Sequence, residues 1–258
     1  MSTVPRLDLT VLGAGPAWSG RPGSSGAAYL VRSDRTAILL DLGQGSFPRL
    51  IAEIEPSRLD AVVISHLHPD HFIDLVPLRH YLAYQLPEAR SVRVIAPSGL
   101  AGRIDALHDR AGFTAATLAC EPMPHAPIPV GDLVVETGRV THTPDSHAIR
   151  VSRGDGAGPG LVYSGDCGVA ADLAWLIRPG DALLVEVTFG AGPVPAGSQH
   201  LDATGIAELV AATRPGRVLL THLQMGLDPD PAIAIVGAAT NAPVTLVEPG
   251  DRYDLRAT

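Results

Sequence analysis

Lysine is absent from this chain of 258 residues, so its 19 basic residues are all arginine. The absence of lysine excludes Schiff-base catalysis, a covalently held pyridoxal cofactor and the lysine of a phosphate-binding loop. The 27 acidic residues outnumber the arginines and give a formal net charge of −8. Because no arginine-rich block stands out either, the composition disfavours nucleic acid as a partner.

Cysteine and long apolar runs are scarce as well. Cys120 and Cys167 are the two cysteines, too few for a disulfide framework, which favours a reducing compartment. No apolar run reaches the roughly 18–20 residues that a membrane-spanning helix needs. Residues 1–6 show no basic segment leading into an apolar core, as a secretory signal would. We therefore expect a cytoplasmic protein without a membrane partner.

Short apolar runs alternate with segments of helical periodicity along the whole chain, and no linker interrupts them. This pattern, with 46% hydrophobic residues, predicts one mixed α/β domain over residues 1–258. The predicted strands are 7–12, 27–31, 37–40, 61–64, 91–96, 133–140, 148–152, 161–164, 182–187, 218–220 and 244–247. The predicted helices are 47–54, 72–84, 100–111, 171–177, 205–212 and 231–239. The proline-rich stretch 120–129 is predicted to be a loop.

The glycines after the first strand are spaced as in a dinucleotide-binding loop. Gly13 and Gly15 fit that spacing, but Pro16 and the later Pro22 oppose the helix that such a loop must open. We therefore expect a Gly/Pro-rich loop without nucleotide-binding function.

Three histidines and an aspartate fall within residues 66–71, just after the predicted strand 61–64. Alternate residues of an extended segment point the same way, so His66 and His68 can hold one ion. Asp70 and His71, turned aside by Pro69, can then serve a second ion. The alternative, a helix cap or a packed ring, explains a lone histidine better than four ligand-type residues at this spacing. Imidazole and carboxylate suit zinc, iron or manganese.

With Ser65 before it and a predicted helix after it, this His-x-His-x-Asp-His pattern resembles the metallo-β-lactamase-fold hydrolase superfamily. The resemblance implies a four-layer αββα sandwich. It also implies two divalent ions, of which zinc is favoured over iron or manganese. The implied ligands are His66, His68 and His142 for one ion, Asp70, His71 and His222 for the other, and Asp166 as a bridge between them.

Within this superfamily, the chain resembles the ribonuclease-Z-like and cyclic-nucleotide-phosphodiesterase-like branch. There Glu186 and His200 match a pair near the metals in which a carboxylate holds a histidine that protonates the leaving oxygen. The alternative reading makes them a strand-end and a helix-start residue. Asp41 matches a support under the site rather than a ligand.

The resemblance implies a hydrolase that attacks its substrate with a metal-bridging hydroxide, with Asp70, Glu186 and His200 as catalytic residues. A small phosphodiester is the favoured substrate, since no excursion for gripping transfer RNA is evident. A lactone, thioester or β-lactam hydrolase is the alternative, and a non-catalytic metal-binding scaffold is less favoured. The sequence does not assign His147, and Cys167 is expected to be buried and inert. Soluble oligomers are most often dimers, so a homodimer is the default expectation.

Overall fold

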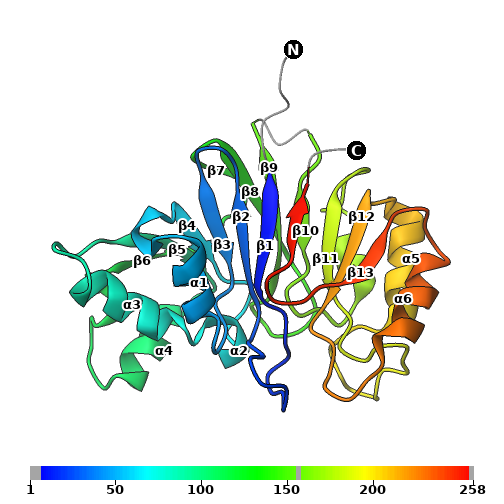
Figure 1. Cartoon of the computed structure of the whole chain (residues 1–258), viewed down its shortest axis with the longest axis horizontal. Coiled ribbons are helices and arrows are strands. Elements are labelled where there is room, and N and C mark those ends of the chain that lie inside the picture. The colour runs from blue at the N-terminus through cyan, green and yellow to red at the C-terminus, as the bar shows by residue number, and fades with distance from the viewer. Residues whose placement is uncertain (1–6, 155–157, 256–258) are drawn as a thin grey trace.

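The structure is a computed structural model that describes residues 7–154 and 158–255. The prediction that residues 1–6 form no signal segment falls outside the described residues. Across the described ranges, the strands form two seven-stranded sheets (Figure 1). Helices cover the outer side of each sheet, which gives the four-layer αββα arrangement and confirms the predicted fold class.

The first sheet carries the N-terminal half of the chain and the last described strand. Its order is β14 (Arg252–Asp254), β1 (Asp8–Gly13), β2 (Ala28–Arg32), β3 (Ala37–Leu40), β4 (Ala61–Val63), β5 (Val92–Ala96) and β6 (Leu118–Pro122). The order of the second sheet is β13 (Val244–Leu246), β12 (Arg217–Thr221), β11 (Ala182–Glu186), β10 (Leu161–Tyr163), β9 (His147–Arg153), β8 (Leu133–Arg139) and β7 (Ile128–Val130).

Each sheet combines an antiparallel part with a parallel part. Strands β3, β4, β5 and β6 run parallel to one another, as do β10, β11, β12 and β13. The helices beside them are α1 (Phe47–Glu53), α2 (Pro69–Phe72), α3 (Leu75–Tyr84), α4 (Leu100–Leu107), α5 (Ala203–Thr213) and α6 (Pro229–Gly237), with 3₁₀ turns η1 (Pro56–Arg58), η2 (Thr114–Ala116) and η3 (Ala170–Leu173). Because parallel strands end at one edge of a sheet, the segments that follow them gather there.

The core has three layers, one between the sheets and one under the helices of each side. In β2, Tyr29 and Val31 face the layer between the sheets, while Ala28 and Leu30 face the helices. Strands buried on both faces read as continuous apolar runs, which is why the central strands were predictable from the sequence. Leu184 of the second sheet is fully buried in the layer between the sheets.

The helix predicted at 72–84 begins at Leu75 in the structure, as α3, and Phe72 is instead the last residue of the separate helix α2. The backbone N–H of Asp74 donates to Leu42 O (3.0 Å), and the carbonyl of Asp70 accepts from Ala27 N (3.0 Å). These two groups would pair with each other in a continuous helix. Contacts with strand-end loops of the first sheet therefore break the helix.

The proline-rich stretch 120–129 is not a simple loop. It contains the end of β6 and the beginning of β7, so that prediction was wrong in part. Both strands lie at sheet edges, where Pro122 and Pro129 remove no ladder hydrogen bond that a further strand would need. Strand β14, which pairs with β1, was not predicted.

Two predicted helices are shorter in the structure. The helix predicted at 100–111 ends at Leu107, and the carboxylate of Asp105 accepts hydrogen bonds from the backbone N–H groups of Gly112 and Thr114. The predicted segment 171–177 contains only the end of η3. None of the described helices is long and apolar enough to cross a membrane.

Candidate metal centre

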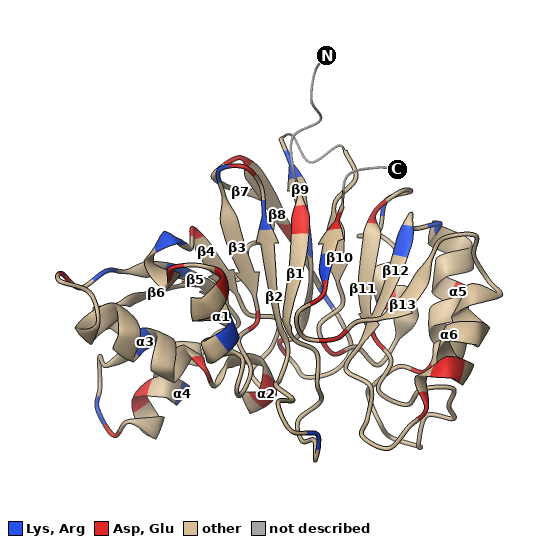
Figure 2. Cartoon of the chain, viewed as in Figure 1, with Lys and Arg blue, Asp and Glu red and all other residues tan. Residues whose placement is uncertain are grey.

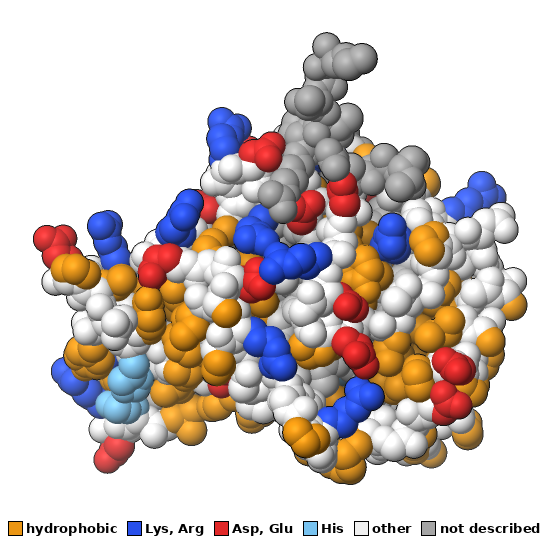
Figure 3. All heavy atoms as spheres, in the orientation of Figure 1, with side chains coloured by type: hydrophobic (Ala, Val, Ile, Leu, Met, Phe, Trp, Pro, Cys, Tyr) orange, Lys and Arg blue, Asp and Glu red, His pale blue; other side chains and the backbone are white. Residues whose placement is uncertain are grey.

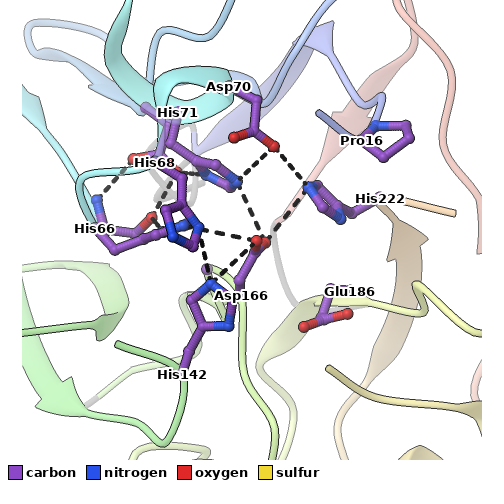
Figure 4. Close-up of polar contacts among 12 residues, drawn as sticks. Pro16, His66, His68, Asp70, His71, His142, Asp166, Glu186 and His222 are labelled. Atoms are coloured by element: carbon purple, nitrogen blue, oxygen red, sulfur yellow. Dashed lines mark hydrogen bonds and ion pairs between the residues drawn. The ribbon is translucent and has the colours of Figure 1, made fainter. Parts of the chain in front are cut away.

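The segment 66–71 leaves β4 and runs directly into α2. His68 has an extended backbone, and Pro69 follows as the first helical residue, where its missing N–H costs nothing. His66 and His71 are fully buried, whereas His68 is exposed. This short turn places the four side chains around one point at the edge of the sheets (Figure 4).

The structure brings His66, His68, His142 and Asp166 into one cluster. His66 Nε2 lies 3.6 Å and His142 Nε2 3.7 Å from Asp166 Oδ2, and His142 Nε2 lies 3.1 Å from His68 Nδ1. His142 follows β8 and Asp166 follows β10, so the second sheet contributes these two side chains. The donor set is three imidazole nitrogens and one carboxylate oxygen.

A second cluster joins Asp70, His71, Asp166 and His222. His71 Nε2 is 3.3 Å and His222 Nε2 is 3.5 Å from Asp166 Oδ1. The same two nitrogens are 3.7 Å and 3.3 Å from Asp70 Oδ2. Asp166 therefore turns one carboxylate oxygen to each cluster, as a bridging ligand would.

The two clusters fit divalent cations. His66 Nε2, His71 Nε2 and Asp166 Oδ1 are buried and have no hydrogen-bond partner among the described residues. Ligands about 2.0–2.1 Å from a tetrahedral zinc ion lie roughly 3.3 Å from one another, which is close to the separations within each cluster. Buried polar atoms without partners are costly, and a cation between them removes that cost.

The side chain of Asp41 supports the site from below and belongs to neither cluster. Its Oδ2 accepts hydrogen bonds from His71 Nδ1, Ser65 Oγ and Tyr163 Oη, each at 2.7 Å. Since a carboxylate only accepts, His71 carries its proton on Nδ1 and presents the Nε2 lone pair to the cluster. The interpretation of Asp41 as a support agrees with this geometry.

Two glycines let the strand-end loops approach Asp70 closely. A Cβ atom on Gly43 or on Gly26 would overlap the carbonyl oxygen of Asp70. That carbonyl accepts the N–H of Ala27, so the backbone of Asp70 is fixed by the loop before β2. Only glycine permits this approach.

The electrostatics of the clusters follow from burial and from the mixture of charges. Burial raises the pKa of Asp166, but the charges of His222 and His71 outweigh it and hold that pKa well below its usual value. Burial and the neighbouring His71 lower the pKa of His66 well below its usual value, which keeps that ring neutral. Burial lowers the pKa of His71 and of His222, but the neighbouring carboxylates outweigh it and raise both, so these rings hold protons that a bound cation would displace.

Glu186 and His200 lie together beside the second cluster. Glu186 is fully buried at the end of β11, and its Oε1 accepts from His200 Nδ1 at 2.9 Å. Burial lowers the pKa of His200, but the hydrogen bond to Glu186 and its charge outweigh this and raise the pKa. The His200 ring is partly exposed, and its Nδ1 is 3.9 Å from Asp166 Oδ2.

Glu186, His200 and His222 also form a third group of potential ligands. The carboxylate of Glu186 already accepts from the backbone N–H groups of Cys167 (2.8 Å), Thr188 (3.2 Å) and Leu201 (3.3 Å), as well as from His200. An oxygen pair with this many donors is satisfied without a cation. We therefore interpret the group as a hydrogen-bonded pair beside the metal site rather than a third metal site.

Two residues that contact cluster histidines, Thr188 and Gln199, were not predicted from the sequence. The hydroxyl of Thr188 lies 3.1 Å from His222 Nδ1, and the backbone carbonyl of Gln199 lies 2.8 Å from His142 Nδ1. Thr188 stands two residues after Glu186, in the turn that follows β11, so strand alternation did not mark its position in the sequence. A backbone carbonyl such as that of Gln199 leaves no signal in the sequence.

The structure places the two unassigned residues outside both clusters. His147 Nε2 pairs with Asp145 Oδ1 at 2.9 Å at the beginning of β9. Cys167 is fully buried, its Sγ donates to Val169 O at 3.2 Å, and burial raises the pKa of its thiol to about 12. A buried thiol of this pKa is unreactive, as expected from the sequence.

A cavity of about 690 Å³ adjoins the site. The loop after β1 and the segment after β12 form its walls, which include Ala14 and Leu223. His222 lies next to Leu223 in the chain, and its backbone N–H donates to Ala14 O at 3.0 Å. Arg21 and Arg49 bring positive charge to the same walls, and Asp228 and Glu248 bring negative charge, with Arg21 Nη1 3.5 Å from Glu248 Oε1. The volume is that of a small-molecule site.

The family described as "Beta-lactamase superfamily domain" matches residues 37–223. An uncharacterized protein of Mycobacterium leprae is 29% identical over 99% of this chain and 91% of its own length. These matches cover the segments that carry every residue of the two clusters.

Solved structures share the fold. The metallo-beta-lactamase fold protein YhfI from Bacillus subtilis has a TM-score of 0.83 at 19% identity and covers 97% of this chain and 100% of its own. The short form of human tRNase Z has a TM-score of 0.72 at 20% identity and covers 96% of this chain and 99% of its own. Zn²⁺-bound PqqB from Methylobacterium extorquens has a TM-score of 0.71 at 18% identity and covers 96% of this chain and 99% of its own.

Proposed function

The chain belongs to the beta-lactamase superfamily, and from this membership we propose that it is a binuclear metal-dependent hydrolase of a small phosphodiester. The observation that carries the proposal is the pair of four-residue clusters that share Asp166, next to the Glu186–His200 pair. Such a site is typical of the metallohydrolases of this superfamily.

We assign His66, His68 and His142 to one ion, Asp70, His71 and His222 to the other, and Asp166 to both. Zinc is the favoured metal because imidazole and carboxylate at these separations suit it, with iron and manganese as alternatives. When bound, two such ions activate a shared water for attack and stabilise the charge that develops on the substrate.

His200 is proposed to protonate the leaving oxygen. Glu186 holds its Nδ1, which leaves Nε2 as the atom that can donate to a substrate. The raised pKa of His200 keeps more of it in the imidazolium form near neutral pH, the form that a general acid needs. Asp70 is the third proposed catalytic residue, since it supplies one of the two carboxylates of the second cluster.

Three features favour a small phosphodiester over RNA. The adjoining cavity, about 690 Å³, has the size of a small-molecule site. On the face drawn in Figure 3, basic and acidic side chains are interspersed and no basic stripe crosses it, and the arginine and acidic positions are likewise mixed along the ribbon in Figure 2. The net charge of −8 opposes a long polyanion. The short form of human tRNase Z, a tRNA nuclease by its name, shares the fold and supports phosphodiester chemistry.

We also propose that the protein is cytoplasmic. Among the described residues, Cys120 and Cys167 are both free, which suits a reducing compartment. A small molecule is the proposed partner.

Hydrolysis assays with metal-quantified protein test the proposal. An activated phosphodiester is compared with an activated lactone, a thioester and a β-lactam, each also after chelation and with the Asp70→Ala variant. We expect phosphodiester turnover that disappears in both controls. Turnover of acyl substrates alone would contradict the proposed substrate class and favour the lactonase, thioesterase or β-lactamase alternative. Two bound ions without turnover of any substrate would favour a non-catalytic scaffold.

A further inference from the structure

The hydroxyl of Thr188 lies between the carboxylate of Glu186 and the ring of His222. It donates its hydrogen to Glu186 Oε2, and its oxygen lies 3.1 Å from His222 Nδ1. Thr188 has 8% of its surface exposed and His222 has 4%, so water does not compete freely for these contacts.

The direction of each hydrogen bond follows from the available protons. A carboxylate only accepts, so the hydroxyl hydrogen of Thr188 is used by Glu186. The oxygen of Thr188 must then accept from His222 Nδ1–H. His200 Nδ1 lies farther from this oxygen, at 3.4 Å, and is closer to Glu186, at 2.9 Å.

In the neutral ring that metal ligation requires, a proton on His222 Nδ1 leaves the lone pair on Nε2. That nitrogen points at Asp70 Oδ2 (3.3 Å) and Asp166 Oδ1 (3.5 Å). Without an ion, the carboxylates favour a proton on Nε2 as well, which donates to Asp70 Oδ2, and a bound divalent ion would take the place of that proton.

We infer that Thr188 is a positioning residue that fixes His222 in the tautomer needed for the second ion and thereby ties that ion to the Glu186–His200 pair. One buried carboxylate then orients two imidazoles, His200 directly and His222 through the threonine hydroxyl. The inference rests on the proposed binuclear function. Thr188 itself touches no reacting atom and is not a catalytic residue.

The test is titration of the metal-free protein with Co²⁺ and Zn²⁺, followed by the number of ions bound and the Co²⁺ absorption spectrum. We compare the wild type with Thr188→Val, which removes the hydroxyl at nearly constant volume, and with Thr188→Ser, which keeps it. Thr10→Val is the matched control, because Thr10 is a buried threonine in the middle of β1.

We expect Thr188→Val to bind the first ion normally and the second about 10–100-fold more weakly, the range typical of lost supports of metal-binding histidines. Thr188→Ser and Thr10→Val should bind both ions as the wild type does. Unchanged affinity in Thr188→Val, or an equal loss in Thr188→Ser, would overturn the inference. If Thr188→Val does not fold, Thr188→Cys replaces it, since a thiol is a poor acceptor.

These readouts separate the inference from the proposed function. A wild type that binds two ions but cleaves no phosphodiester would contradict the proposed substrate class. The titrations of the Thr188 variants would then still decide the role of Thr188. A wild type that binds fewer than two ions would overturn both.

Discussion

At the scale of residues, the site depends on how the far nitrogens of three of its five histidines are held. His71 Nδ1 is bonded to Asp41, His142 Nδ1 to the carbonyl of Gln199 and His222 Nδ1 to Thr188. Each bond fixes a ring orientation and leaves the other nitrogen for a cation. The ligands are therefore arranged before any ion binds.

The first prediction concerns Asp70. Replacing it by alanine removes a carboxylate from the second cluster, and we expect bound metal to fall from two ions toward one and phosphodiester turnover to disappear. Metal analysis and initial rates on the same preparation measure this. Asp230→Ala, at an exposed position of α6, is the control and should change neither. Full turnover by Asp70→Ala would contradict the assignment.

The second prediction separates acid catalysis from metal binding. His200→Ala should lower turnover by about 10²–10⁴-fold with both ions retained, because it removes the proposed proton donor and no ligand. Glu186→Gln should have a smaller effect in the same direction. His108→Ala, an exposed histidine away from the clusters, should be silent. Loss of metal in His200→Ala would show that the donor assignment is wrong.

At the scale of elements, the loop between β1 and β2 is held in place by two side chains that follow β3, those of Gln44 and Arg49. Arg49 of α1 donates to Gly23 O (2.6 Å) and to Ser25 Oγ (3.2 Å), and Gln44 donates to Ala17 O (3.2 Å). This loop forms one wall of the cavity beside the site. Its order is therefore set by contacts far along the chain.

The third prediction addresses this wall. Arg49→Met removes a charge from the cavity and two hydrogen bonds from the loop, and we expect KM for the phosphodiester to rise about tenfold, which corresponds to roughly 1.4 kcal/mol. The value of kcat should change much less. Arg58→Met, at an exposed arginine of η1, is the control. An unchanged KM would mean that the cavity does not receive the substrate.

The fourth prediction tests the layer between the sheets. Leu184 is fully buried there, so Leu184→Ala should reduce the free energy of unfolding by about 2–5 kcal/mol. Urea denaturation measures the change. Leu107→Ala, at a leucine that is 60% exposed on α4, should cost far less. Equal costs at the two positions would contradict the assignment of Leu184 to the core.

At the scale of the whole molecule, the proposed metal centre joins the two sheets. His66, His68, Asp70 and His71 come from the first sheet, and the other ligands come from the second (Figures 1 and 4). Tyr163 of the second sheet also donates to Asp41 of the first, beneath the clusters. Bound ions therefore link the halves of the chain.

The fifth prediction follows from this link. An ion that binds only the folded protein adds about 2.7 kcal/mol of stability at a free concentration 100 times its Kd. We expect chelation to lower Tm and added Zn²⁺ to restore it, measured by thermal unfolding. The Asp70→Ala variant should show a smaller Tm difference between chelated and loaded protein. An identical Tm with and without metal in the wild type would argue against ions at this interface.

Local patterns determined much of this protein from the sequence alone. The central strands are buried on both faces, so uninterrupted apolar runs such as residues 37–40 and 182–185 marked them. The candidate ligands stand next to strand ends, and parallel strands end at a common edge, so their convergence followed from their positions. The family resemblance, now confirmed, supplied the pairing of ligands and the two-sheet arrangement.

Contacts between distant segments decided the rest. The break between α2 and α3 depends on Leu42 and Ala27, and the edge positions that admit Pro122 and Pro129 depend on which strands find neighbours. The tautomer of His222 depends on Thr188, 34 residues earlier in the chain. A sequence specifies which groups are present, but hydrogen bonds across the fold choose their partners, and only the tertiary structure brings those partners within reach.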